Sequence, residues 1–158
     1  RPLNASLPIF DPLGFEQRFA PEPGELVLLQ EGEAAERHSL VDRGHTPCIF
    51  EKIYFARPDA YMSGRSVYDG RMAFGRQLAD EFRAKGLDGD VVIPIPDTSR
   101  PAAQAFAEHL GILYREGFIK NRYSGRTFIM SDVATRERAL RLKLNPIRHV
   151  FKIGRAHV

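Results

Sequence analysis

The apolar run from Val91 to Ile95 is the feature that most limits what this chain can fold into. A continuous apolar run of this length is typical of a strand buried on both faces of a parallel sheet. Pro94 lies inside the run and indicates that the strand ends about there, because proline has no N–H to donate. An alanine-rich helix is expected from Pro101 to Leu110, and residues 112–119 have the composition of the next strand. This strand–helix–strand order predicts an α/β fold with a parallel sheet and flanking helices.

Weaker signals place further elements on either side of this unit. Phe74, Leu78 and Phe82 recur at helical spacing, which predicts a helix over 66–85 that is closed by the glycines after it. A second, basic helix is expected over 135–144. Strands are expected from the β-branched and apolar composition of residues 26–29, 49–56 and 149–151. Residues 44–47 are a plausible junction between two domains.

The charges of the chain are unevenly distributed. Residues 115–158 carry 11 Lys and Arg against 3 Asp and Glu, a net charge of +8. The whole chain has a net charge of +3, so the first 114 residues carry −5. A basic half suits a phosphorylated ligand or a nucleic acid, but aromatic side chains do not interleave with the cations, so base stacking is unsupported. No apolar run approaches the roughly 20 residues that cross a bilayer.

Cys48 is the only cysteine, which excludes an internal disulfide and favours a reducing, cytoplasmic location. A lone cysteine of this kind is expected to be a small buried residue. The histidines show no regular spacing to one another or to a pair of carboxylates. The sequence therefore gives no support to a nucleophilic triad.

Residues 120–130 combine cations, hydroxyl groups and a glycine in one short stretch. Hydrogen-bond donors clustered on a glycine-containing loop suit a flap that folds over a polyanion such as pyrophosphate. The alternative is an ordinary basic surface loop.

Asp97, Thr98 and Ser99 follow directly after the apolar strand. Ligands of parallel sheets gather beyond the carboxyl ends of the strands, so these oxygens could hold a Mg²⁺-bound phosphate or a ribose. The alternative is a turn or helix N-cap, where the same residue types are favoured.

Several stretches, in the same order and spacing, closely resemble the amidophosphoribosyltransferase family. They are Cys48-Ile49-Phe50-Glu51, Ile53 to Asp59, Val91 to Ser99 and Lys120 to Met130, with further matches at Arg141, Lys143 to Asn145 and Arg148. The resemblance implies a partial type I phosphoribosyltransferase fold over residues 48–152. Residues 1–47 would be the β-rich tail of an N-terminal-nucleophile glutaminase domain. Residues 153–158 do not match, and we predict that they are a non-native tail.

The resemblance implies an enzyme that makes 5-phosphoribosylamine from phosphoribosyl pyrophosphate and glutamine-derived ammonia, in the first step of purine synthesis. Residues 120–130 match the family's flexible loop, which implies substrate-binding roles for Lys120, Arg122, Tyr123, Arg126 and Thr127, continued by Arg136, Arg141 and Lys143. Thr98 matches a position assigned to Mg²⁺, and Cys48 matches a cysteine that binds a 4Fe-4S cluster in some members. Purine nucleotides as feedback ligands and a homo-oligomeric full-length protein are also implied, without nucleic-acid or membrane partners.

Two departures from the family predict that this chain is an inactive fragment. The N-terminal nucleophilic cysteine does not occur, and neither does the acidic loop expected after Phe151-Lys152. No catalytic residue is therefore assigned. The alternative function is a regulatory module that binds phosphoribosyl pyrophosphate without catalysis.

Overall fold

The computed structural model of the chain describes residues 11–14, 21–41, 44, 46–125 and 127–152. The chain divides into two compact units, Arg1–Gly70 and Arg71–Val158. The boundary that the sequence predicts at residue 47 stays a prediction. Among the described residues, no helix is both long and apolar enough to cross a bilayer.

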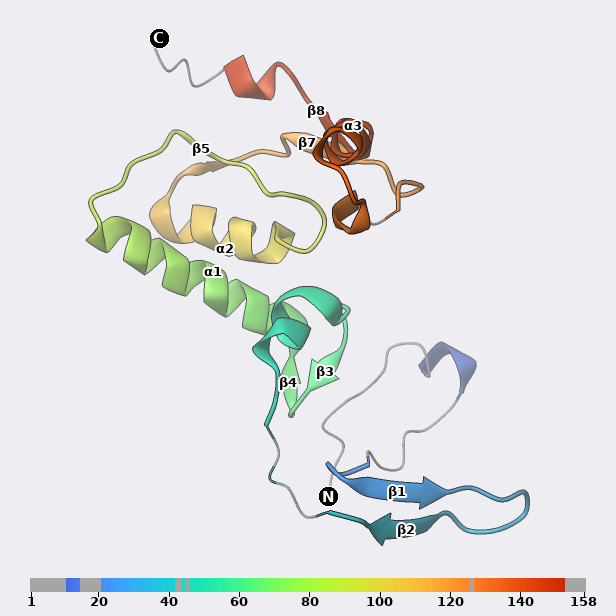
Figure 1. The fold of residues 1–158 in the computed structure, drawn as a ribbon. Helices are drawn as coiled ribbons and strands as arrows, with labels where there is room; N and C mark the ends of the chain where they lie inside the picture. Colours follow the sequence, from blue (N-terminus) through green and yellow to red (C-terminus); the bar gives the residue numbers. More distant parts are fainter. Residues whose placement is uncertain (1–10, 15–20, 42–43, 45, 126, 153–158) are drawn as a thin grey trace. The chain divides into compact units, whose positions relative to one another are not determined.

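The first unit is built from two hairpins and short helical turns (Figure 1). After a 3-10 turn at Asp11–Leu13, strand β1 (Glu25–Leu28) pairs antiparallel with β2 (Glu36–Ser39). Strand β1 confirms the strand expected at residues 26–29, to within one residue. Strands β3 (Tyr61–Met62) and β4 (Arg65–Ser66) form a second hairpin around Ser63 and Gly64, which both have positive φ, as a tight two-residue hairpin turn requires.

Residues 49–56 were expected to form a strand, and this prediction is wrong. Glu51–Phe55 forms a π-helical turn, η2, in which the N–H of Ala56 donates to the carbonyl of Glu51 at 2.8 Å. The ring of Phe50 lies 5.4 Å from the rings of both Tyr54 and Phe55, a cluster that helical spacing allows and alternating strand faces do not. Local aromatic contacts therefore override a strand-like composition here.

Cys48 is exposed, so the expectation of a buried cysteine is also wrong. Pro47 and Ile49, the residues on both sides of it, are exposed as well.

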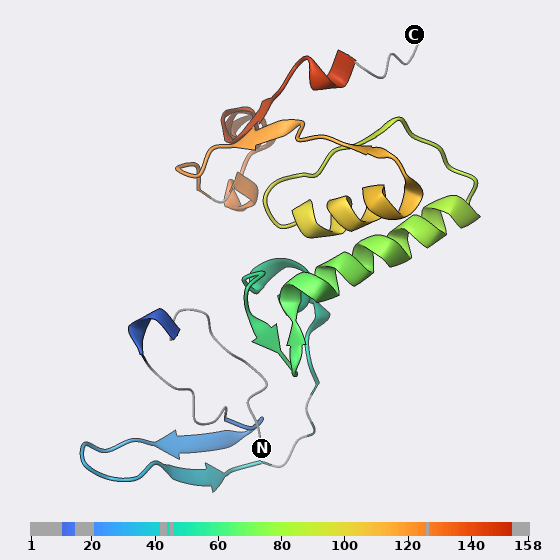
Figure 2. The ribbon, with the colours of Figure 1, turned by 180° about the vertical axis from the view of Figure 1, so that it is seen from behind.

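The second unit contains the predicted strand–helix–strand motif. Strand β5 (Val91–Val92) pairs parallel with β6 (Leu113–Tyr114), and α2 (Arg100–Leu110) connects them. Helix α1 (Val67–Ala84) runs beside α2, and α2 lies between α1 and the β5–β6 pair (Figures 1 and 2). The structure is therefore α/β with a small parallel sheet, as predicted.

Both helices end where the sequence predicts. After α1, Gly86 has φ 63°, and the N–H groups of Gly86 and Leu87 donate back to Arg83 and Phe82 in a Schellman closure. After α2, Gly111 adopts φ 71° and its N–H donates to the carbonyl of Ala107.

Small residues bring α1 and α2 close together. A Cβ at Gly75 would collide with the backbone carbonyl of Ala102, and Ala79 and Ala105 are fully or almost fully buried. Phe82 and Phe106 pack edge to face with ring centroids 5.3 Å apart. The core of this unit is therefore a tight helix–helix contact beside a short sheet.

Residues 112–119 were expected to form one strand, but they form two with different partners. Strand β7 (Phe118–Lys120) pairs antiparallel with β8 (Leu144–Pro146), which the sequence did not predict. Gly117 separates β6 from β7, and its missing Cβ leaves room for the side chain of Ile93. Residues 115–117 belong to no strand, so the expected single strand is interrupted there.

The last elements also differ in part from expectation. The basic helix is present as α3 (Val133–Lys143), after a 3-10 turn η3 (Thr127–Ile129). Residues 149–151 were expected to begin a strand, but Val150–Lys152 forms a 3-10 turn, η4, whose Phe151 ring packs 5.2 Å from that of Phe118. The N–H of Val150 donates to the carbonyl of Ile147, which closes this turn locally instead of pairing it with a strand.

We predict that Gly75→Ala destabilises the chain by about 1–3 kcal/mol, because the added methyl overpacks the α1–α2 contact against backbone. Gly70→Ala in the same helix is the matched control, since nothing lies within 4 Å of its Cβ position. It should stabilise the helix by about 0.5–1 kcal/mol. Urea unfolding measures both changes, and equal effects of the two substitutions would contradict the packing account.

We predict that α3 frays at low pH because its N-cap is a carboxylate. Asp132 accepts a hydrogen bond from the N–H of Thr135 at 2.7 Å, and this bond, with others to the same carboxylate, holds the pKa of Asp132 below its usual value. A lowered folded pKa means that the stabilisation is fully present above about pH 4 and is lost as pH falls through the folded value. Carbon chemical shifts of residues 133–136 report the helix. Asp132→Asn should cap without this pH dependence, and a parent-like pH response in that variant would argue against the N-cap as its cause.

Candidate functional site

The candidate site begins at the turn where the chain leaves β5. Pro94 and Pro96 are buried and fix the backbone on either side of the exposed Ile95. Residues 96–99 form the turn, with a cis peptide bond between Pro96 and Asp97. The Ser99 hydroxyl donates to the carbonyl of Ile95 at 2.6 Å. Ser99 occupies the N-cap position of α2 but makes no side-chain capping bond, so its hydroxyl braces the turn instead.

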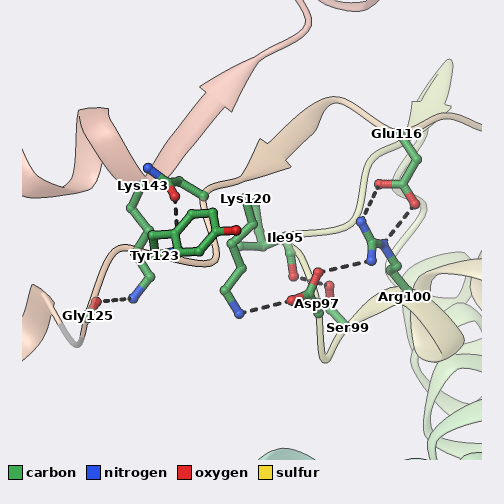
Figure 3. Close-up of polar contacts among 10 residues, drawn as sticks. Ile95, Asp97, Ser99, Arg100, Glu116, Lys120, Tyr123, Gly125 and Lys143 are labelled. Atoms are coloured by element: carbon green, nitrogen blue, oxygen red, sulfur yellow. Dashed lines mark hydrogen bonds and ion pairs between the residues drawn. The ribbon is translucent and has the colours of Figure 1, made fainter.

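Asp97 joins this turn to two other elements. Its Oδ1 accepts from Nη1 of Arg100 at 2.9 Å, and its Oδ2 accepts from Nζ of Lys120 at 3.0 Å (Figure 3). Arg100 is the first residue of α2 and Lys120 is the last residue of β7. One carboxylate therefore links the turn, the helix that follows it and the start of the basic loop (residues 120–130).

The pKa of Asp97 lies below its usual value. Partial burial is the largest single influence and raises the pKa, but it is outweighed by the hydrogen bond and charge of Lys120 and by the charges of Arg100 and Arg122. Asp97 is therefore ionised at neutral pH and attracts these three cations.

Arg100 also binds a second carboxylate. Its Nε donates to Oε1 of Glu116 at 3.0 Å, and Nη2 lies 3.5 Å from Oε2 (Figure 3). The hydroxyl of Tyr114 donates to the same Oε1 at 2.9 Å. Burial raises the pKa of Tyr114 to about 12, helped by Glu116, so the phenol keeps its proton.

The basic loop leaves β7 and returns to β8 through α3. At its base, the N–H of Asn121 donates to the carbonyl of Lys143 at 2.8 Å, and Nζ of Lys143 donates to the carbonyl of Gly125 at 3.0 Å. Within the loop, Oδ1 of Asn121 accepts from the N–H of Tyr123 at 3.0 Å. The backbone and side chain of Lys143 therefore hold the loop at Asn121 and at Gly125.

The predicted loop residues fall in different surroundings. Lys120 is bound to Asp97, whereas the side chain of Tyr123 is fully exposed. Arg122 is exposed, near enough to influence Asp97, and Thr127 is half-buried at the start of η3. Arg126 lies outside the described residues. Arg136 and Arg141 are exposed on α3.

Thr98 lies half-buried in the turn beside Asp97. The described residues contain no group of three or more His, Cys, Asp or Glu side chains that could hold a metal ion by themselves. A metal at Thr98 would therefore need further ligands from beyond these side chains.

Sequence reasoning missed Arg100, Glu116 and Tyr114. The helix was expected to begin at Pro101, so Arg100 was given no role, and Glu116 was counted only as one of the three acids among residues 115–158. The available signal was the parallel pairing itself, because it places the residues after β6 beside those after β5.

The arrangement of these side chains can bind an anion. Lys120, Arg122 and Lys143 supply cationic donors around the turn and the loop, and Thr98 and Ser99 supply hydroxyl groups. Such donors suit recognition of phosphate oxygens.

Comparison with known proteins points to one family, although no family model matches the chain. The chain is 48% identical over 145 residues to the amidophosphoribosyltransferase of Pseudomonas aeruginosa, covering 90% of this chain and 29% of that protein. It is 50% identical over 131 residues to the Pyrococcus horikoshii protein of the same name, covering 82% of this chain and 28% of the relative.

Solved structures agree. The Bacillus subtilis glutamine phosphoribosylpyrophosphate amidotransferase, complexed with ADP and GMP, matches with a TM-score of 0.63 and 40% identity, over 82% of this chain and 28% of that one. A structure described as the allosteric regulatory enzyme of purine biosynthesis matches with the same TM-score and identity. The chain is therefore homologous to a segment of the amidophosphoribosyltransferases that spans about 29% of their length.

Proposed function

We propose that this chain is part of an enzyme that transfers glutamine-derived ammonia to phosphoribosyl pyrophosphate, giving 5-phosphoribosylamine, pyrophosphate and glutamate. The observation that carries the proposal is the link between Asp97 and Lys120, which places the basic loop beside the turn after β5. The identity of 48% over 145 residues supports the choice of reaction. Within that enzyme, residues 48–152 would form the first part of a type I phosphoribosyltransferase domain, and residues 1–47 the end of a glutaminase domain.

The role of this segment would be to bind and orient pyrophosphate oxygens. Charge builds up on the departing pyrophosphate, so fixed cations lower the barrier by stabilising that charge. Arg122 and Lys143 are the best-placed donors, because neither makes an ion pair with a carboxylate among the described contacts. Lys120, by contrast, is held by Asp97 and would act mainly at the base of the loop.

The Thr98 hydroxyl would help to hold a Mg²⁺ ion. Mg²⁺ prefers oxygen ligands and keeps several waters, so the Thr98 hydroxyl together with substrate phosphates fits this ion. When bound, the ion would supply further positive charge toward the leaving group. Thr98 would orient it, while the ionised Asp97 stays paired with Lys120 and Arg100.

The chain does not fit an iron–sulfur cluster by itself. A 4Fe-4S cluster needs four cysteine thiolates, and Cys48 is the only cysteine in the sequence.

Three further properties stay expectations from the family resemblance and the composition. They are regulation by purine nucleotides, a homo-oligomeric full-length protein and a cytoplasmic location. The regulatory module without catalysis also stays a prediction, and no contact among the described residues favours it.

We predict that the purified chain binds pyrophosphate in the presence of Mg²⁺, and that Arg122→Ala weakens this binding about tenfold through loss of one charged hydrogen bond. Isothermal titration calorimetry with Mg²⁺ and inorganic pyrophosphate measures the dissociation constant. Lys85→Ala is the matched control, since it removes an exposed cation just after α1 and should leave the affinity unchanged.

Equal weakening by Lys85→Ala would show that binding is a general effect of charge. Absence of binding in the parent chain, under conditions where it unfolds cooperatively, would overturn the assignment of this segment as a pyrophosphate site.

A further inference from the structure

Glu116 lies outside the turn and outside the basic loop, yet it is connected to both. It stands in the link between β6 and β7, where its carboxylate accepts from Arg100 and from the hydroxyl of Tyr114. Its side chain is 38% exposed, so burial does not explain why two donors converge on it.

The shape of Arg100 makes Glu116 more than a charge partner. A guanidinium is a rigid planar fork, so fixing Nε and Nη2 against one group also fixes the direction of Nη1. In this structure Glu116 holds the Nε side, and Nη1 points to Oδ1 of Asp97 at 2.9 Å. The second oxygen of Asp97 is then directed to Lys120 at 3.0 Å.

Tyr114 restrains the side-chain orientation of Glu116. Its hydroxyl donates to Oε1 at 2.9 Å and keeps its proton at neutral pH, so it acts only as a donor there. The result is a continuous series of hydrogen bonds and ion pairs that runs from Tyr114 through Glu116, Arg100 and Asp97 to Lys120. It joins β6, α2, the turn and β7.

We propose that Glu116 is a positioning residue for the phosphate-binding turn: by orienting Arg100 it orients Asp97, and so keeps the base of the basic loop docked through Lys120. The part of this inference that concerns ligand affinity rests on the proposed function. The part that concerns docking of the loop does not.

A positioning role of Glu116 and a simple effect of its charge predict opposite changes in anion affinity when the side chain is removed. Glu116 is negative, so if its charge alone mattered, removing it would strengthen the binding of an anion. If it positions Arg100, truncating it to Ala frees the guanidinium, loosens Asp97 and weakens anion binding. Glu116→Gln separates the two, because its amide oxygen still accepts from Nε while the charge is gone.

The first arm of the test is hydrogen exchange on the chain without ligand. Glu116→Ala should speed exchange of the amides of residues 120–124 about two- to tenfold, the equivalent of one lost hydrogen bond. Glu116→Gln should stay within about twofold of the parent. Glu108→Ala is the matched control, because it removes a carboxylate on α2 that accepts only from Gln104 among the described contacts. Parent-like exchange in Glu116→Ala would overturn the inference.

The second arm is titration with Mg²⁺ and inorganic pyrophosphate. Glu116→Ala should raise the dissociation constant about two- to tenfold, whereas Glu116→Gln should bind as the parent does or more tightly. Tighter binding by Glu116→Ala would overturn the inference in favour of a charge effect. If the parent itself does not bind pyrophosphate, the proposed function fails, and the exchange arm alone decides whether Glu116 positions the loop.

Discussion

The structure around the candidate site depends on one carboxylate that serves two cations from different elements. Asp97 binds Arg100 through one oxygen and Lys120 through the other. The contact with Arg100 is local, three residues along the chain, whereas Lys120 lies 23 positions after Asp97, so that contact joins segments distant in sequence. Without these contacts, the start of the basic loop would have no polar tie to the turn after β5 among the described contacts. The geometry of an anion site between turn and loop follows from this shared carboxylate.

The same contacts contribute little to stability. The side chains of Asp97 and Lys120 are 40% and 31% exposed, and ion pairs at such exposure are each worth about 0–1 kcal/mol. The unit is stabilised instead by the close approach of α1 and α2 at Gly75 and by the buried alanines between them. Packing of the helices therefore sets the position of α2, and the ion pairs set the orientation of side chains at its first turn. A weak interaction can control a site in this way when the framework around it is already fixed.

Sequence patterns predicted the parts of the fold whose causes are local. The β5–α2–β6 unit, the caps at Gly86 and Gly111 and the position of α3 follow from apolar runs, helical spacing and glycine punctuation, and the structure has them. The failures concern segments whose conformation depends on contacts elsewhere. Residues 49–56 have the composition of a strand but form a helical turn around three rings. Residues 112–119 form two strands because each part pairs with a different partner strand, β5 or β8, which no local pattern reveals.

Only part of the candidate site could be predicted from the sequence. Residues at the end of β5 and in the basic loop were identified from residue type and order, and the structure brings Asp97 and Lys120 together. Arg100 and Glu116 were missed because their pairing depends on how β5 and β6 are aligned. The most direct test of the account is a double-mutant cycle on Asp97→Ala and Lys120→Ala, read by hydrogen exchange of residues 120–124. The account predicts that each substitution speeds exchange and that the double substitution adds little to either one. Fully additive effects would show that the two side chains act separately and would contradict the account.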